Sequence, residues 1–489
     1  MNRFFSEDLQ RIYSCSADEV LSHNNRFKRL HQLFADSFGG KGAEFIVRAP
    51  GRVNLIGEHT DYNGYPVLPM ALDREIVLVI SPRKDATIRL RNQNPYYTER
   101  IFTAALPLEP FPQGDWGNFV KAALSGLLEV GLVDVKNVIG FDAIVGGTIP
   151  ESAGLSSSSA MVVGSALAFL AVNKVEADYK HLADLMARAE RYVGSEGGGM
   201  DQAASLLAEP QKALRIDFFP LRVQTFSVPE GISFVICNSL VRASKSESAQ
   251  YAYNLRVVEG RLAAALLAQA VEQKFGRKVK VDHLSDLSAE KLGVDPSSLM
   301  KLAAESMGDR PLSLKEIGSR LHRSAEDLER KYCTSKHGTV LKEPPGGFQV
   351  WHRYRHVITE TERVDHTVSA LKDGNIHEVG KLMSQSHASC RDDYEVSCPE
   401  LDTLVSLGVK NGALGGRLTG AGFGGCTVHA VPSDRVDNFI RGVTDEYYHG
   451  YVRDNKNRNF IPYGDLQEVM FRCRASAGAC VWSTEQSIT

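Results

Sequence analysis

Several common signatures of binding and catalysis are missing from this chain of 489 residues. No GxxxxGK(S/T) string occurs, which excludes the usual P-loop nucleotide site at the level of sequence. The eight cysteines include no CxxC pair, so the sequence indicates neither a zinc ribbon nor a disulfide framework. A net charge of −3 gives no large basic field, so we expect neither nucleic acid nor an anionic membrane as a main partner.

A hydrophobic run long enough to cross a membrane is also missing. The longest apolar stretch, residues 160–172, is interrupted by Gly164 and Ser165 and is shorter than the ~20 residues that a transmembrane helix needs. The first ten residues, MNRFFSEDLQ, place charges where a secretory segment needs an apolar core. We therefore expect a cytoplasmic protein.

The length of the chain exceeds the size at which one hydrophobic core usually stops growing, so we expect two domains. Strand-like and helix-like segments are mixed along the chain, which favours an α/β or α+β fold. We place the domains at 1–205 and 206–489. Residues 271–345 are richer in Lys, Glu, Asp and Ser and carry a capping-box pattern at Ser313 and Glu316, so we expect an inserted helical subregion there.

Hydrophobic periodicity predicts the elements of the first half of the chain. The expected helices cover residues 5–38, a segment after Asp115, and residues 161–172; the expected strands cover residues 45–47, 53–56, 76–80, 88–91 and 141–145.

Residues 51–62, GRVNLIGEHTDY, form the first motif. A strand-like stretch ends at Gly57. Five residues with hydrogen-bonding side chains follow it, and these side chains suit a polyhydroxylated ligand: Glu58, His59, Thr60, Asp61 and Tyr62. A solvated turn is an alternative interpretation. A metal site is another, although no nearby His or Cys supplies the usual third ligand.

Residues 150–160, PESAGLSSSSA, form the second motif and lead into an apolar helix. A Gly/Ser loop at a helix N-terminus points backbone N–H groups at an anion, and the helix dipole favours phosphate. The four hydroxyls could add donors or a Mg²⁺ ligand. A helix cap with a small-residue packing surface is the alternative.

Two further segments carry acidic or glycine-rich patterns. In residues 187–202, ARAERYVGSEGGGMDQ, Glu190 is expected on a helix, and Asp201 follows three glycines that allow a close backbone approach. A helix that simply ends at a glycine is the alternative. Residues 417–428, RLTGAGFGGCTV, are typical of a glycine-rich turn between two strands.

The three motifs occur in the order found in the GHMP small-molecule kinases, and the first resembles the galactokinase signature. The second resembles the family pattern PxxxGLSSSA, from which Ser159 departs because Ala is usual there. The resemblance implies a two-domain α/β (α+β) GHMP-kinase-like fold with the active site in the interdomain cleft. It implies Mg²⁺-dependent transfer of phosphate from ATP to the anomeric hydroxyl of galactose, giving galactose 1-phosphate and ADP. Longer galactokinases also carry extra sequence at 271–345, and we expect a monomer.

The resemblance also implies roles for individual residues. Asp201 would act as the catalytic base or orient the hydroxyl, and Arg52 would pair with it. Ser158 and Glu190 would hold Mg²⁺. The predicted sugar-binding residues are Glu58, His59, Asp61, Gly199 and Tyr253; the predicted ATP-binding residues are Gly154, Leu155, Ser156, Ser157, Ser158, Ser159 and Ala160.

Other substrates and another function stay open at this point. The similar N-acetylgalactosamine kinases tend to have Phe where this chain has Tyr253, which favours galactose over N-acetylgalactosamine. Arabinose is a further possible acceptor, since a pocket admits a near-isostere at a cost of only ~1–3 kcal/mol. A regulator that binds galactose and ATP without turnover is the alternative from a different class. Cys390 and Cys398 we interpret as packing residues.

Overall fold

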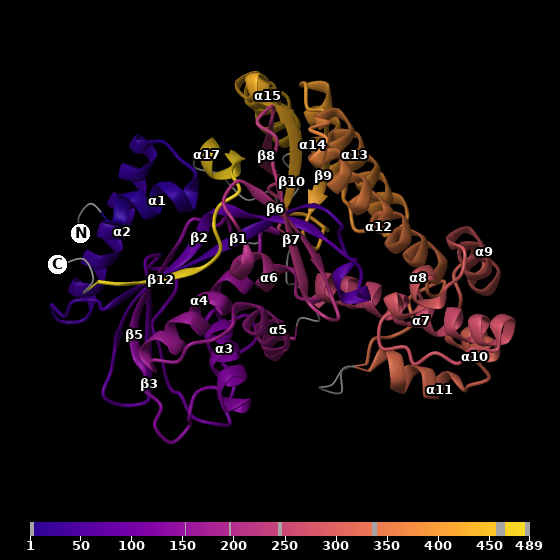
Figure 1. Cartoon of the computed structure of the whole chain (residues 1–489), viewed down its shortest axis with the longest axis horizontal. Coiled ribbons are helices and arrows are strands. Elements are labelled where there is room, and N and C mark those ends of the chain that lie inside the picture. The colour runs from indigo at the N-terminus through magenta and orange to yellow at the C-terminus, as the bar shows by residue number, and fades with distance from the viewer. Residues whose placement is uncertain are drawn as a thin grey trace.

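The computed structural model describes residues 4–151, 153–194, 197–242, 247–334, 340–455 and 465–484. Its largest sheet has six strands in the order β12-β1-β2-β5-β3-β4, and every pair of neighbours except β3 and β5 is antiparallel (Figure 1). The strands are β1 (Phe45–Ile56), β2 (Leu68–Pro82), β3 (Thr87–Asn92), β4 (Arg100–Thr103), β5 (Phe141–Gly147) and β12 (Cys480–Ser483).

The strand β1 corrects one prediction. Residues 45–47 and 53–56 are parts of a single strand, because the Pro50-Gly51 step is absorbed as an irregularity in the pairing with β2. At Gly51 an added Cβ would lie 2.5 Å from the Leu155 carbonyl oxygen, so the glycine allows the second motif to approach β1. The pairing of β12 with β1 brings the end of the described chain into the first sheet. The division at residues 205 and 206 stays a prediction.

Alternate residues of this sheet face two different helical layers. Ile46, Val77 and Ile144 pack against α1 (Phe4–Tyr13) and α2 (Ala17–Ser37), whereas Val47 and Leu78 face the helices on the other side. The prediction of one helix over 5–38 was wrong. The chain breaks after Tyr13, and Ser16 starts α2 with a capping box that includes Glu19. The helices of the other layer are α3 (Gly117–Glu129), α4 (Ser157–Val172), α5 (Tyr179–Ala189) and α6 (Met200–Leu207).

Helix α4 begins earlier than predicted, at Ser157 instead of Met161. The helix is apolar on all sides, since it packs against the sheet and against α3 and α6. The apolar pattern in the sequence therefore predicted the buried part of the helix but not its first turn, which begins with serines.

A second sheet has the strand order β11-β8-β10-β9, and the glycine-rich 417–428 motif forms the turn between β9 and β10, as predicted. The strands are β8 (Ile232–Asn238), β9 (Gly415–Thr419), β10 (Cys426–Pro432) and β11 (Met470–Cys473), with a separate hairpin of β6 (Lys212–Asp217) and β7 (Arg222–Ser227). The accompanying helices are α12 (Val350–Lys372), α13 (Ile376–Asp392), α14 (Pro399–Lys410), η5 (Ser433–Arg435), α15 (Val436–Val443), η6 (Thr444–Tyr451), α16 (Val452–Asp454) and α17 (Leu466–Val469).

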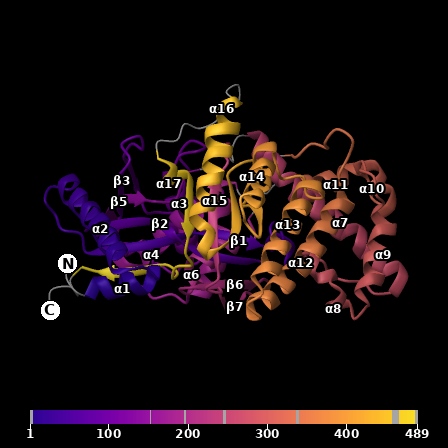
Figure 2. The ribbon, with the colours of Figure 1, turned by 90° about the horizontal axis from the view of Figure 1, so that it is seen from above.

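The segment 271–345 is helical over most of its described length. Its first residues belong to the long helix α7 (Glu247–Phe275), and a separate core of leucines holds the short helices that follow. Ser313 and Glu316 form the predicted capping box. These helices lie at the opposite end of the molecule from α1, α2 and β12 (Figures 1 and 2). They are η3 (Leu284–Leu287), α8 (Ala289–Leu292), α9 (Pro296–Met307), α10 (Leu314–Leu321), α11 (Ala325–Leu328) and η4 (Glu329–Cys333). Across the described ranges, no helix has the length and apolar character needed to span a membrane.

Candidate active site

The loop of residues 57–67, which contains the 3₁₀ helix η1 (Asp61–Asn63), connects β1 to β2. Glu58, His59 and Asp61 are only 2%, 3% and 7% exposed, so the interpretation of this segment as a solvated turn is wrong. Gly57 has a φ of +95°, and an added Cβ would lie 2.8 Å from the Cα of Val67, so only glycine fits this tight turn. The loop therefore holds three buried hydrogen-bonding side chains at the end of a strand.

Glu58 connects this loop to the third motif. Its Oε2 accepts hydrogen bonds from Arg417 Nη1 at 3.0 Å and from the Gly420 N–H at 3.1 Å. Burial raises the pKa of Glu58, while the neighbouring guanidinium of Arg417 acts in the opposite direction. Arg417 also donates to the Asn54 carbonyl oxygen on β1. Glu58, which we predicted to contact the sugar, thus has a structural partner as well.

His59 lies within a group of tyrosines that includes Tyr253 of α7, another predicted sugar-binding residue. The ring centroids of His59 and Tyr253 are 5.7 Å apart, and His59 Nδ1 lies 3.0 Å from the Tyr62 hydroxyl. That hydroxyl is in turn 2.9 Å from the hydroxyl of Tyr394. Burial lowers the pKa of His59 well below its ordinary value, so the imidazole is neutral at pH 7. Its Nε2 has no hydrogen-bond partner in the described part of the chain, which leaves it free to bind a ligand hydroxyl.

Asp61 lies close to Asp201, the acidic residue of the 187–202 segment. Burial and repulsion from Asp201 raise the pKa of Asp61 to about 6. The glycines before Asp201 make this proximity possible. An added Cβ on Gly198 would lie 2.3 Å from the Tyr62 nitrogen and 2.5 Å from the Asp61 carbonyl carbon. Gly199, with a φ of +108°, is the N-cap of α6, whose first turn carries Asp201.

Arg52 joins Asp201 to the second motif. Its Nε lies 2.8 Å from Asp201 Oδ1, and its Nη1 donates to the Gly154 carbonyl oxygen at 2.6 Å. Arg52 is 5% exposed, and it comes from the part of β1 that follows the irregularity at Gly51. One side chain thereby fixes the acid relative to the glycine-serine loop.

The glycine-serine loop itself meets the third motif through two glycines. An added Cβ on Gly420 would lie 2.5 Å from the Gly154 carbonyl oxygen, and one on Gly154 would lie 2.8 Å from the Thr419 carbonyl oxygen. Ser156 precedes α4 with a φ of +60°, and its buried Oγ has no partner among the residues described. An unpaired buried hydroxyl at the N-terminus of a long helix fits a phosphate group, which the first N–H groups of α4 can bind.

Glu190 lies beside a different serine from the one predicted. Ser159 Oγ donates to Glu190 Oε2 at 2.6 Å, and Gln202 Nε2 donates to the same oxygen. Ser158 is partly exposed, whereas Ser159 is buried. Glu190 was predicted to lie on a helix. It is the first residue of the 3₁₀ helix η2 (Glu190–Val193), and the α-helix α5 ends one residue before it.

The residues here fit a magnesium ion. A carboxylate and nearby hydroxyls are hard oxygen ligands, and Mg²⁺ in kinase sites uses one or two carboxylates together with substrate phosphates. Within the described ranges, no group of three or more His, Cys, Asp or Glu side chains could hold a metal ion. His59 and Asp61 are therefore not part of such a metal cluster.

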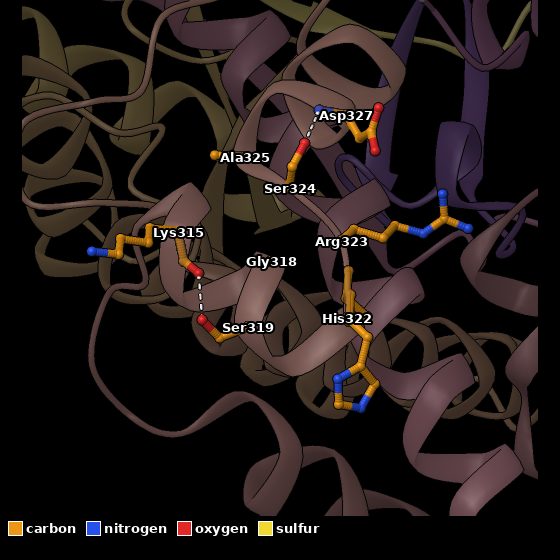
Figure 3. Close-up of a pocket in the computed structure, with 9 residues that line it drawn as sticks. Lys315, Gly318, Ser319, His322, Arg323, Ser324, Ala325 and Asp327 are labelled. Atoms are coloured by element: carbon orange, nitrogen blue, oxygen red, sulfur yellow. Dashed lines mark hydrogen bonds between the residues drawn. The ribbon is translucent and has the colours of Figure 1, made fainter.

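A cavity of about 740 Å³ lies in the helical segment and is lined by residues from Lys315 to Asp327 (Figure 3). None of the predicted site residues lines it. A smaller cavity of about 340 Å³ is lined partly by Gly198, Gly199 and Phe218.

Sequence reasoning missed Arg417, Gln202 and Tyr394 as members of the site. Arg417 begins the third motif, and an arginine inside a strand-like segment is a usable signal because a buried guanidinium requires an acidic partner. Tyr394 gives no such signal, since a lone tyrosine is usually a core residue.

Comparison with known proteins decides the family. The galactokinase galactose-binding signature matches residues 32–82, the N-terminal domain of GHMP kinases matches 118–209, and the C-terminal domain matches 367–449. The galactokinase of Dictyostelium discoideum is 36% identical, over 98% of this chain and 97% of its own length. This chain belongs to the galactokinase family. The galactokinase of Saccharomyces cerevisiae is 32% identical, over 90% of this chain and 91% of its own length.

Solved structures of galactokinase-family and related proteins agree on the fold. The crystal structure of Lactococcus lactis galactokinase complexed with galactose matches with a TM-score of 0.72 and 27% identity, covering 93% of this chain and 99% of that one. Mevalonate kinase of Methanococcus jannaschii matches with a TM-score of 0.52 and 18% identity, covering 89% and 99%. The predicted GHMP-kinase fold is confirmed.

Proposed function

We propose that this member of the galactokinase family transfers the γ-phosphoryl group of ATP to the anomeric hydroxyl of galactose, giving galactose 1-phosphate and ADP. The observation that carries the proposal is the double contact of Arg52, to Asp201 and to the Gly154 carbonyl oxygen. It puts a carboxylate and a cation next to a helix N-terminus suited to phosphate. Phosphoryl transfer needs little more from a protein than this positioning and charge stabilisation.

The sugar would bind at the 57–67 loop. Asp61 and the neutral imidazole of His59 would bind sugar hydroxyls, and Tyr253 would close the site from α7. Glu58, which is held by Arg417, would present its carboxylate in a fixed position. Because Glu58, His59 and Asp61 are buried before ligand arrives, little side-chain entropy is lost on binding.

Asp201 would accept a hydrogen bond from the anomeric hydroxyl and take its proton as the new bond from oxygen to phosphorus forms. ADP leaves with the electrons of the broken bond. Arg52 lies between Asp201 and the phosphate loop, so its charge stabilises the phosphoryl group during transfer.

The nucleotide would place its phosphates at the N-terminus of α4, over residues 154–160. Ser158 and Glu190 would hold Mg²⁺, with Ser159 and Gln202 orienting the carboxylate. A magnesium ion held there would supply positive charge to offset that of the nucleotide phosphates. We expect the reaction to take place in the cytoplasm.

Sugar-dependent release of ADP by the purified protein tests the proposal. Galactose, N-acetylgalactosamine and arabinose are compared at equal concentrations in the presence of Mg²⁺ and ATP. We expect galactose to give the highest kcat/KM. A preference for another sugar would change the substrate, and no turnover with any sugar, together with galactose binding, would support a regulator instead.

A further inference from the structure

The helical segment of residues 271–345 includes a short turn, residues 283–287, that packs on the 57–67 loop of the sugar site. The Asp286 carboxylate accepts hydrogen bonds from the N–H groups of Asp282 at 3.0 Å and of His283 at 2.9 Å, so the turn is closed on itself. Leu284 and Leu287 are buried in the core that includes α7. This turn is therefore anchored at both ends and can support a neighbouring loop.

Its first contact is with the 57–67 loop. Gly64 has a φ of +82°, and an added Cβ there would lie 2.3 Å from Ser285 Oγ and 3.2 Å from His283 Cβ. Gly64 ends η1, because its N–H donates to the Asp61 carbonyl oxygen at 2.9 Å. Tyr65 is buried in the same core as Leu284. The turn thus packs directly on the residue that ends the Asp61 helix.

The second contact leads toward Asp201. The His283 ring stacks on Phe219 with centroids 3.7 Å apart and planes within 16°. Phe219 contacts Phe218, with centroids 6.3 Å apart. Phe218 Cε1 lies 3.7 Å from the position of an added Cβ on Gly199, the N-cap of the helix that carries Asp201.

The two supported loops also touch each other, because Gly198 packs on the backbone of Asp61 and Tyr62. We propose that the turn 283–287 is a positioning element for the sugar site. Ser285 against Gly64 and His283 against Phe219 together set the distance between Asp61 and Asp201. This inference rests on the proposed function and gives the extra helical segment of this chain a role in sugar affinity.

The proposal is tested by comparing Gly64→Ala with a matched glycine. Gly276 also has a left-handed φ of +64°, yet an added Cβ there meets nothing within 4 Å. Both substitutions introduce the same kind of backbone strain, but only Gly64→Ala pushes against the turn. Since a misplacement of about 1 Å can cost about 100-fold in rate, we expect Gly64→Ala to raise the galactose KM at least about tenfold.

The remaining readouts separate positioning from general damage. The KM for ATP should stay within about twofold in Gly64→Ala, because the contacts described for the turn are with Gly64 and Phe219, and neither belongs to the loop at residues 150–160. Gly276→Ala should behave as wild type. Adding Ser285→Gly to Gly64→Ala removes the obstructing Oγ and Cβ, so the galactose KM should fall back toward the wild-type value.

Gentler variants at His283 keep the proposal testable if Gly64→Ala does not fold. His283→Ala removes the ring from Phe219, and we expect the galactose KM to rise about threefold, the scale of one aromatic contact. His283→Phe keeps a flat ring and should restore the wild-type KM.

Assays of the wild-type protein in parallel distinguish failure of the proposed function from failure of the positioning role. If wild type does not phosphorylate galactose, the proposed function and this inference both fall. If wild type is active but Gly64→Ala and His283→Ala leave the galactose KM unchanged, or change the galactose and ATP KM values alike, the positioning role is wrong and the function stands.

Discussion

The guanidinium of Arg52 holds Asp201 at 2.8 Å, and the same side chain bonds the carbonyl oxygen of Gly154 at 2.6 Å. The first motif, the second motif and the segment that carries Asp201, which are far apart in the chain, therefore meet at one arginine. Gly198 brings the Asp201 segment onto the 57–67 loop, and Gly420 brings the third motif onto Gly154. The site is built from backbone contacts that tolerate no side chain, which explains why glycines gather in all three motifs.

Glycines 197 and 198 provide a direct test of this packing. Gly198→Ala would place a Cβ within 2.5 Å of the Asp61 and Tyr62 backbone, whereas an added Cβ on Gly197 meets nothing within 4 Å. We expect Gly198→Ala to lower kcat/KM for galactose at least about tenfold, because it separates Asp61 from Asp201. Steady-state kinetics of both variants measure this. Equal effects from the two substitutions would show that the contact is unimportant.

Asp61→Asn should stabilise the protein at neutral pH while weakening galactose binding. The pKa of Asp61 is raised from 3.8 to about 6, so the folded state holds the proton more tightly and stability falls as pH rises from about 4 to 6. Above about pH 6 the buried Asp61 carboxylate is ionised. The difference between the two pKa values then lowers the free energy of unfolding by on the order of 3 kcal/mol.

Melting temperatures from pH 4 to pH 8 check this prediction. We expect Asp61→Asn to melt above wild type at pH 7.5, with the difference vanishing toward pH 4. A variant that melts at or below wild type at pH 7.5 would mean that Asp61 is not a strained carboxylate. The galactose KM of wild type should also rise as pH falls through about 6.

Part of the fold was visible in the sequence, whereas the packing of the site depended on contacts between distant segments. The order of the three motifs, the turn between β9 and β10 and the Ser313 capping box were predicted correctly. The break after Tyr13 was missed, although Ser16 and Glu19 form a capping box that the sequence displays. The continuity of β1 through Pro50 was missed because a bulge and a strand end look alike in sequence.

The partners of buried charges were harder to predict. The pairing of Glu58 with Arg417 and of Glu190 with Ser159 depends on side-chain direction at the ends of different elements. Spacing along the chain carries no information about such pairs.

Ser158 and Ser159 should differ in how they affect the requirement for Mg²⁺. Ser158→Ala removes the predicted ligand, and we expect the Mg²⁺ concentration at half-maximal rate to rise more than about tenfold. Ser159→Ala leaves Gln202 on Glu190 and removes one hydrogen bond worth about 1 kcal/mol, so the rise should stay below about fivefold. Titrations of Mg²⁺ at fixed ATP, and calorimetric binding of MgATP, measure both. The reverse order would identify Ser159 as the ligand.

Arg417→Met should destabilise the fold strongly, because it leaves the Glu58 carboxylate buried without its partner. We expect the free energy of unfolding to fall by about 3–5 kcal/mol. The pair of Lys410 and Glu446 is a matched control, since its side chains are 67% and 34% exposed. Lys410→Met should cost less than about 1 kcal/mol in the same urea titrations. Similar losses in both variants would argue against a buried ion pair at Glu58.

The role of Asp201 in phosphoryl transfer is best tested by using phosphorus NMR to monitor the formation of galactose 1-phosphate. Wild type and Asp201→Asn are compared with ATP, Mg²⁺ and galactose. The asparagine keeps the size of the side chain but cannot take the proton. We expect wild type to convert galactose, and Asp201→Asn to lose about 100-fold or more in kcat while galactose and ATP still bind. Product formation by Asp201→Asn at a rate near that of wild type would contradict the account.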